Sequence, residues 1–182
     1  MNSYIVKTPT ELSEEEIKTI LEAWDVEEWK NMNSDEFKTR FDKSEFHLLA
    51  DENAQLLSVA RINHKFRVKI GETVYQISEL VGFVAIVILH EYGKTLLSKT
   101  AENLKSRNIE AIGFCRKRTS RFYETTGFNL FYDKVKFIRE WKDGAWFTPV
   151  EDDHIVSVTL GEKTSPLFEN LSDENPAYLL FE

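Results

Sequence analysis

The longest apolar run lies near the middle of the chain and predicts a buried strand. Leu80–Leu89 is apolar throughout except for Gly82, a pattern typical of a strand that is covered on both faces. The polar segment His90–Thr95 follows it, and then a helical pattern over Leu96–Arg107 and a second apolar run, Ile109–Cys115. We therefore predict a strand, a polar loop, a helix and a second strand. The second strand should pair in parallel with the first through a right-handed crossover.

Before this central segment, the pattern predicts a short strand and two amphipathic helices. Tyr4–Val6 can form the strand. Ser13 and Glu16 have the spacing of a capping box, in which each side chain bonds the other residue's backbone amide at a helix start. Ser34 opens a second short helix. We expect the two helices to form a lid across one end of a sheet.

Apolar and polar residues then alternate in a way that indicates an antiparallel meander. Phe46–Ala50 and Leu56–Ile62 are separated by a short turn and predict a hairpin. Phe66, Val68 and Ile70 alternate with charged residues, so this strand should have one half-exposed face. The meander leads directly into the central strand.

The C-terminal region has a different texture. Ile155–Leu160 predicts a strand, 163–174 is polar and predicts a loop, and Ala177–Phe181 is either a terminal strand or a docking tail. We interpret 1–141 as the core and 142–182 as a C-terminal extension packed on the same domain. The region from Ala145 either completes the sheet or forms a homodimer contact.

Size and charge restrict the partners. At 182 residues the chain fits one domain with an extension. Its net charge of −8 argues against nucleic acid, because phosphate backbones are bound by an excess of Lys and Arg. A cationic small molecule or a basic peptide would be attracted instead, although the charge can also serve solubility alone.

The expected location is cytoplasmic. Cys115 is the lone cysteine and cannot form an internal disulfide, which favours a reducing compartment. No apolar run has the roughly 20 residues of a membrane-spanning helix, so we expect no membrane segment. The N-terminus also lacks the pattern of a signal peptide.

The polar segment His90–Thr95 is a candidate anion site. Free amides at a helix start, together with the helix dipole, favour phosphate. Gly93 permits close approach and Lys94 adds a positive charge. The alternative is an ordinary strand-to-helix turn. A nucleotide P-loop is excluded because Ile88 stands where its first glycine is needed, and Lys94 stands where a zinc protease would have its second His. The histidines are scattered, and we expect no metal site.

The segment Phe122-Tyr123-Glu124-Thr125-Thr126-Gly127-Phe128, with the order of elements around it, resembles the GCN5-related N-acetyltransferase (GNAT) family. That family often carries Phe/Leu-Tyr-Glu-x-x-Gly-Phe here. The resemblance covers 1–141 in element order and 79–128 by motif. It implies an α/β (α+β) fold: a mixed, mainly antiparallel sheet flanked by helices, followed here by the C-terminal extension.

The resemblance also implies acetyl-CoA as the co-substrate. The implied cofactor-binding residues are Val84, Ala85, Ile86, Val87, His90, Tyr92, Gly93, Lys94, Thr95 and Arg116. Compared with the family's pyrophosphate loop, Gly93 matches, whereas His90 and Thr95 depart and the loop looks shortened. An Asn common in the family is replaced by Cys115-Arg116-Lys117-Arg118. Those cations would meet the CoA 3′-phosphate or form a solvated turn.

Two residues are candidates for proton transfer. By resemblance, Tyr123 would protonate the departing CoA sulfur; alternatively it is a core aromatic beside Phe122. Glu79 starts the central strand, where several family members carry a general base, and apolar neighbours would raise the pKa of its carboxyl. Alternatively it is a solvated residue at a strand end. Backbone amides at Val84–Val87 would stabilise the carbonyl oxyanion.

The leading hypothesis is direct transfer of an acetyl group from acetyl-CoA to a primary amine on a small molecule or peptide. Asp25, Glu27 and Glu28 could attract the ammonium group or form a wet helix face. A second hypothesis is a degenerate fold that binds CoA or a protein without catalysis. A third, based only on Gly93-Lys94-Thr95, is another phosphate-ligand enzyme.

Overall fold

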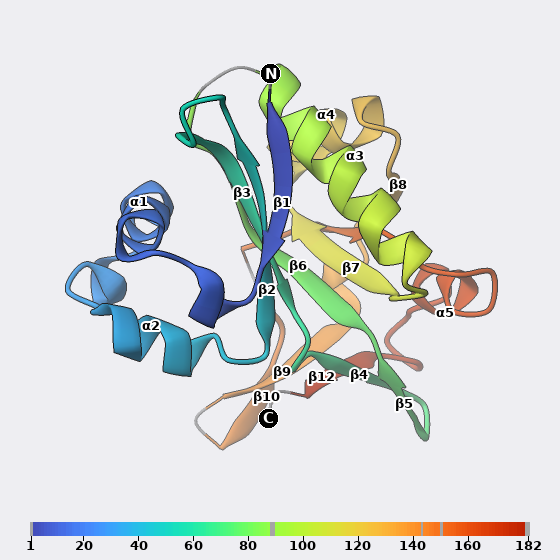
Figure 1. Ribbon diagram of the computed structural model, residues 1–182. Helices are drawn as coiled ribbons and strands as arrows, with labels where there is room; N and C mark the ends of the chain where they lie inside the picture. The colour runs from blue at the N-terminus through green and yellow to red at the C-terminus, as the bar shows by residue number, and fades with distance from the viewer. Residues whose placement is uncertain (1, 88–89, 143, 150, 181–182) are drawn as a thin grey trace. The chain divides into compact units, whose positions relative to one another are not determined.

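The structure is a computed structural model that describes residues 2–87, 90–142, 144–149 and 151–180 (Figure 1). The chain divides into two compact units. Unit 1 contains the residues up to His64 and Val81–Thr100, and unit 2 contains Lys65–Leu80 and the residues from Ala101 onward. The expected boundary at residue 141 therefore falls inside unit 2.

Unit 1 is an antiparallel sheet with helices beside it. β1 pairs with β2 and β2 with β3, all antiparallel, so the expected hairpin is confirmed. The strands are β1 (Ser3–Lys7), β2 (Ser44–Ala50), β3 (Leu56–Asn63) and the second half of β6 (Ser78–Ala85). The helices are η1 (Pro9–Glu11), α1 (Glu14–Trp24), η2 (Glu27–Trp29), α2 (Ser34–Arg40) and the first part of α3 (His90–Ser106).

Both amphipathic helices of unit 1 begin at a capping box. Ser13 Oγ accepts from the Glu16 amide at 3.1 Å, and Glu16 Oε2 accepts from the Ser13 amide at 2.8 Å, as the sequence predicts. α2 begins at Ser34, as expected, and the residue before it is the cap. Asn33, rather than Ser34, accepts from the first-turn amides of α2.

An aromatic core holds these helices on the sheet. Phe37 of α2 and Phe46 of β2 are fully buried, and Trp24 at the end of α1 packs on both. Phe41 completes the group, with its ring 4.8 Å from that of Phe37. Burial of aromatic side chains dominates the energetics of small cores, so this group anchors α1 and α2 on β2.

Unit 2 contains the predicted parallel pair. Ser78 lies opposite Ala111 and Leu80 opposite Gly113, so β6 and β7 run parallel and the expected arrangement is confirmed. β11 lies antiparallel to both β7 and β8. The elements here are β7 (Ala111–Cys115), η3 (Lys117–Thr119), α4 (Ser120–Thr125), β8 (Asn129–Phe131), η4 (Val135–Phe137) and β11 (His154–Ser157).

A separate five-stranded sheet in unit 2 was not foreseen from the sequence. Its order is β10-β9-β12-β4-β5, and β12 pairs antiparallel with β4 and parallel with β9. Its strands are β4 (Arg67–Ile70), β5 (Thr73–Gln76), β9 (Ile138–Lys142), β10 (Ala145–Phe147) and β12 (Ala177–Leu180). The segment expected to be loop contains the short helix α5 (Ser165–Glu169). The mixed, mainly antiparallel fold with flanking helices is confirmed.

The polar segment after the central strand is helical, which corrects the expected loop. β6 ends at Ala85, and α3 already begins at His90, so Tyr92–Thr95 form its first turns. Ile88, Leu89 and the His90 side chain lie outside the described residues. One glycine costs a helix only about 1 kcal/mol, and Glu91 in the first turn suits the dipole. Gly93 is therefore tolerated inside the helix.

Candidate active site

Gly82 interrupts β6 with a left-handed backbone conformation. Its φ is +62°, and a Cβ placed there would lie 2.8 Å from the Trp24 indole. Trp24 Nε1 donates to the Gly82 carbonyl at 2.7 Å. Only glycine meets both requirements without strain, so this residue lets the indole lie against the strand. The single break in the apolar run was the signal for this feature.

The strand residues predicted to stabilise an oxyanion follow this glycine. Val84 and Ala85 lie in β6. The amides of Ile86 and Val87 both donate to the Leu57 carbonyl, at 2.9 and 3.1 Å. Their use as oxyanion donors stays a prediction, and it requires these two bonds to open.

The residues of the predicted anion site lie in the first turns of α3. Gly93 is buried, Lys94 and Thr95 are half-buried, and Glu91 is exposed. The Tyr92 carbonyl accepts from Ser58 Oγ at 3.4 Å, a bond that ties this turn to β3. A helix of this length carries partial positive charge at its N-terminus, and phosphate binding there stays a prediction.

In unit 2, the motif around Tyr123 forms a helix C-terminus. The Phe128 amide donates to the Tyr123 carbonyl, and the Gly127 amide donates to the Glu124 carbonyl. With Gly127 at φ +92°, this is the Schellman pattern that ends helices. Its usual apolar contact is present, because the rings of Tyr123 and Phe128 lie 6.4 Å apart. The motif thus has a structural role whatever Tyr123 does chemically.

Tyr123 is one of three neighbouring groups whose pKa values are raised, so each of them stays protonated to a higher pH than usual. Burial raises the pKa of its hydroxyl, with further contributions from Cys115 and Asp152. Burial likewise raises the pKa of Cys115 to about 11, so this thiol is a poor nucleophile near neutral pH. Burial raises the pKa of the Asp152 carboxyl as well.

The two other predicted residues of unit 2 have structural partners. Glu79 lies in β6 opposite Ile112 of β7. Arg116 follows β7, and its guanidinium donates to Glu151 at 3.2 Å with both side chains exposed. Binding of a CoA phosphate by Arg116 would replace this exposed ion pair.

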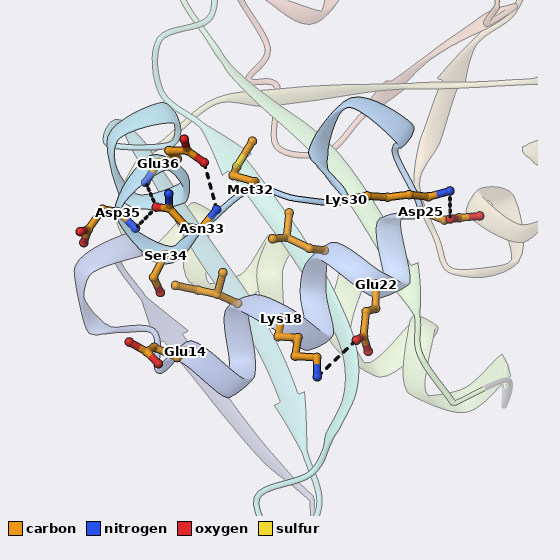
Figure 2. A pocket seen from close by; sticks show the side chains of 12 residues that line it. Glu14, Lys18, Glu22, Asp25, Lys30, Met32, Asn33, Ser34, Asp35 and Glu36 are labelled. Carbon is orange, nitrogen blue, oxygen red and sulfur yellow. Dashed lines mark hydrogen bonds and ion pairs between the residues drawn. The ribbon is translucent and has the colours of Figure 1, made fainter.

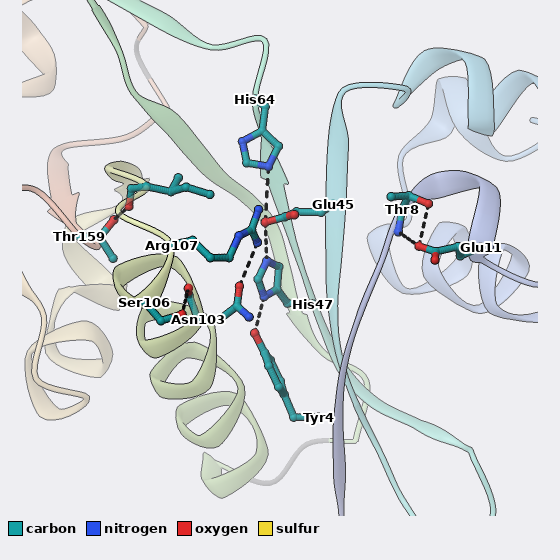
Figure 3. Close-up of polar contacts among 11 residues, drawn as sticks. Tyr4, Thr8, Glu11, Glu45, His47, His64, Asn103, Ser106, Arg107 and Thr159 are labelled. Carbon is teal, nitrogen blue, oxygen red and sulfur yellow. Dashed lines mark hydrogen bonds and ion pairs between the residues drawn. The ribbon is translucent and has the colours of Figure 1, made fainter.

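Unit 1 contains a buried polar row that the sequence did not reveal (Figure 3). The fully buried His47 lies 2.6 Å from the Tyr4 hydroxyl through Nδ1, and 3.4 Å from Glu45 Oε1 through Nε2. His64 Nε2 is 3.4 Å from the same carboxylate oxygen. Within the parts of the chain that the structure describes, no three or more His, Cys, Asp or Glu residues are grouped so that they could hold a metal ion.

Unit 1 also has two hollows. We call the larger, of about 930 Å³, the acidic hollow (Figure 2). Its lining residues are Glu14, Ile17, Lys18, Leu21, Glu22, Asp25, Lys30, Met32, Asn33, Ser34, Asp35 and Glu36. We call the smaller, of about 350 Å³, the aromatic pocket. It is lined by Ala23, Trp24, Val26, Trp29, Arg61, Val81, Gly82, Phe83 and Val84.

Solved structures identify the fold. An N-acetyltransferase from Staphylococcus aureus Mu50 superposes with a TM-score of 0.56 at 13% identity, over 87% of this chain and 98% of that chain. A GNAT family N-acetyltransferase from Escherichia coli, in complex with CoA, gives 0.59 at 9% identity, over 100% and 89%. An acyl-CoA N-acyltransferase from Pseudomonas aeruginosa gives 0.54 at 12%, over 85% and 99%.

This chain has the GNAT fold. No family model matches it, and no curated protein matches it in sequence. At these identities the likeness establishes the GNAT fold alone, and the chemistry has to be argued from the residues. Across the described residues, no helix is both long and apolar enough to pass through a bilayer.

Proposed function

We propose that this GNAT-fold protein transfers an acetyl group from acetyl-CoA to a primary amine. The observation that carries the proposal is the succession of a glycine-interrupted strand and a long helix. Gly82 lies in β6, and α3 starts soon after the strand ends. In this proposal the pantetheine arm of acetyl-CoA lies along the strand, and the start of the helix binds its negatively charged pyrophosphate.

The proposed acetyl-CoA residues of unit 1 follow from this placement. Helix amides at Tyr92 and Gly93, with the ammonium of Lys94 and the hydroxyl of Thr95, bind the pyrophosphate. His90 begins the same turn. The backbone of Val84–Val87 lies along the pantetheine arm and the acetyl carbonyl. Arg116 of unit 2 contributes charge for the 3′-phosphate.

The reaction balances without a covalent enzyme intermediate. The amine nitrogen forms a bond to the thioester carbonyl carbon, the carbon–sulfur bond breaks, and the products are an amide and the CoA thiol. One proton leaves the nitrogen and one reaches the sulfur. In our proposal Glu79 accepts the first and Tyr123 gives the second. The raised pKa of Tyr123 keeps its hydroxyl protonated at neutral pH, as a proton donor must be.

The acceptor is a primary amine on a small molecule or a peptide. Protection of Cys115 by burial and its lone occurrence fit a reducing, cytoplasmic setting. Nucleic acid is not expected as a partner, because the chain carries a net charge of −8. The region from Ala145 supplies strands to the sheets, which is one of the two expected alternatives. A homodimer through this region stays a prediction.

The test combines acetyl-CoA binding with release of the CoA thiol in the presence of an amine panel. Tyr123→Phe should lower kcat by at least about 100-fold, as removal of a general acid does, and should leave the Kd of acetyl-CoA unchanged. Tyr132→Phe, a change at an exposed tyrosine in the same unit, is the matched control. Equal turnover of the two variants would remove Tyr123 from the reaction.

A second candidate is a non-catalytic module that binds CoA or a protein. Two observations favour it. The amides of Ile86 and Val87 already donate to the Leu57 carbonyl. Tyr123 has a structural role in ending α4. This candidate predicts acetyl-CoA binding by calorimetry with no CoA release for any amine. Turnover with a single amine would eliminate it.

A further inference from the structure

We propose that the aromatic pocket binds the acceptor, and that the acceptor is a primary amine carried on an aromatic group. This inference rests on the proposed acetyl transfer and adds the class of substrate. The features that support it are the size of the pocket, its rings, its charge and the strand that it shares with the proposed acetyl-CoA residues.

The pocket has the size of a small-ligand site. Its volume of about 350 Å³ lies at the lower end of the roughly 300–1,000 Å³ typical of ligand pockets. That space suits a single ring with a short arm. A folded peptide or a nucleotide would need a larger site.

Two indoles form its walls. The rings of Trp24 and Trp29 meet edge to face, with centroids 5.6 Å apart and planes at 61°. Trp24 is held in place by its bond to the Gly82 carbonyl and by its packing on Phe37. A third aromatic ring can pack on such a fixed pair, offset on one ring or edge to face.

The charges in and around the pocket disfavour polycations. Arg61 is the one charged residue among the described residues that line it. The guanidinium of Arg40 lies 5.3 Å from the Trp29 ring centroid, and that of Arg61 lies 4.7 Å from the Phe41 ring centroid. A further cation would meet like charges, whereas an amine next to Arg61 is shifted toward its neutral, nucleophilic form.

The strand connects the pocket to the proposed reaction. Val81–Val84 line the pocket, and Val84 is also the first of the residues proposed to lie along the acetyl group. Successive strand residues are about 3.3 Å apart. An arm of two or three bonds from a ring in the pocket is therefore long enough to bring a nitrogen to Ala85.

The closing experiment compares 2-phenylethylamine with spermidine as acceptors, using the full chain and acetyl-CoA. We expect kcat/KM to be at least tenfold higher for 2-phenylethylamine. Trp29→Ala should lower that value at least tenfold through a higher KM, with the Kd of acetyl-CoA unchanged. Trp141→Ala removes an exposed tryptophan of unit 2 and should change neither quantity. A preference for spermidine, or equal behaviour of the two variants, overturns the proposal.

A binding measurement separates this inference from the proposed function. In the unmodified protein, 2-phenylethylamine should shift the indole NH resonances of Trp24 and Trp29 and leave those of Trp141 and Trp146 in place. This result would support the pocket even without any CoA release, in which case only the acetyl transfer would fail. Unchanged resonances of Trp24 and Trp29 at millimolar amine would overturn the pocket proposal, whatever the enzyme assay shows.

Discussion

The acidic hollow and the aromatic pocket share helix α1 but differ in chemistry. Five carboxylates and two lysines line the acidic hollow, whereas two tryptophans, one phenylalanine and one arginine are the largest side chains of the aromatic pocket. In the acidic hollow, Lys18 and Glu22 lie 3.9 Å apart with both side chains mostly exposed. Water screens such charges, so a pair of this kind contributes little.

If the aromatic pocket is the acceptor site that we propose, net charge is a poor guide to the bound ligand. The chain carries a charge of −8, and its larger hollow is acidic, yet those carboxylates keep their hydration. The rings of the aromatic pocket are half-buried and fixed by packing. A ligand gains more binding free energy by displacing water from fixed apolar walls than by pairing with charges that water and salt already screen.

The largest expected effect comes from the core beneath the aromatic pocket. Phe37→Ala should lower the free energy of unfolding by about 3–5 kcal/mol, because it leaves a cavity under Trp24. Denaturant unfolding measures this loss. Phe147→Ala, a change at a partly exposed ring in unit 2, should cost less than about 0.5 kcal/mol. Similar losses would mean that the aromatic core does not support unit 1.

The next effect tests the contact between Gly82 and Trp24. Gly82→Ala should cost about 2–3 kcal/mol, since a positive φ strains alanine and its Cβ would strike the indole. Gly71→Ala is a matched control: φ is +58°, but nothing lies within 4 Å. The difference between the two variants in lost unfolding free energy measures the cost of the clash between the Cβ at position 82 and the indole. Trp24 fluorescence should shift in that variant alone.

A smaller effect tests the first turn of α1, the helix whose residues line both hollows. Burial raises the pKa of Glu16, but bonds from Lys7 and Ser13 outweigh it, so the pKa lies below its ordinary 4.5. Glu16→Gln should cost about 1 kcal/mol at pH 7. This contribution is present above pH 4.5 and is lost as the pH falls through the lower folded value.

Unfolding of the unmodified protein and of the Glu16→Gln variant between pH 7 and pH 3 measures that dependence. The two stability curves should converge on acidification. Glu15→Gln, one residue earlier on the same helix, controls for the general loss of a first-turn carboxylate. A gap that widens toward pH 3 would contradict the assigned role of Glu16.

The smallest effect belongs to the acidic hollow. Glu22→Gln should change the free energy of unfolding by less than about 0.5 kcal/mol, because its pair with Lys18 is exposed. It should also leave kcat/KM for an aromatic amine unchanged. If kcat/KM for spermidine fell tenfold in this variant, the acidic hollow would be the acceptor site instead.

Local features of the fold could be predicted from the sequence. The capping box at Ser13, the hairpin of β2 and β3 and the parallel pairing of β6 with β7 were all expected, because each follows from spacing within a short segment. The five-stranded sheet was not, because its strands come from three distant parts of the chain. Such pairings depend on contacts that no local pattern encodes.

The candidate site was predictable to a similar degree. Gly82 was visible as the one break in an apolar run, but its partner Trp24 could not be found, since the contact joins residues 58 positions apart. The sequence showed Cys115 as the lone cysteine, but the burial that raises the pKa of its thiol could not be predicted from it. The roles of Tyr123 and Glu79 stay predictions.

The place of β12 has a consequence for synthesis of the protein. Its register joins Leu180 to Arg67 and Leu179 to Glu140, so an interior strand of that sheet is synthesised well after the strands on either side of it. During translation, β4 and β9 must wait with an unpaired edge until residues 177–180 emerge from the ribosome. Nascent chains in that interval expose hydrogen-bonding edges to one another, which makes it a period of aggregation risk.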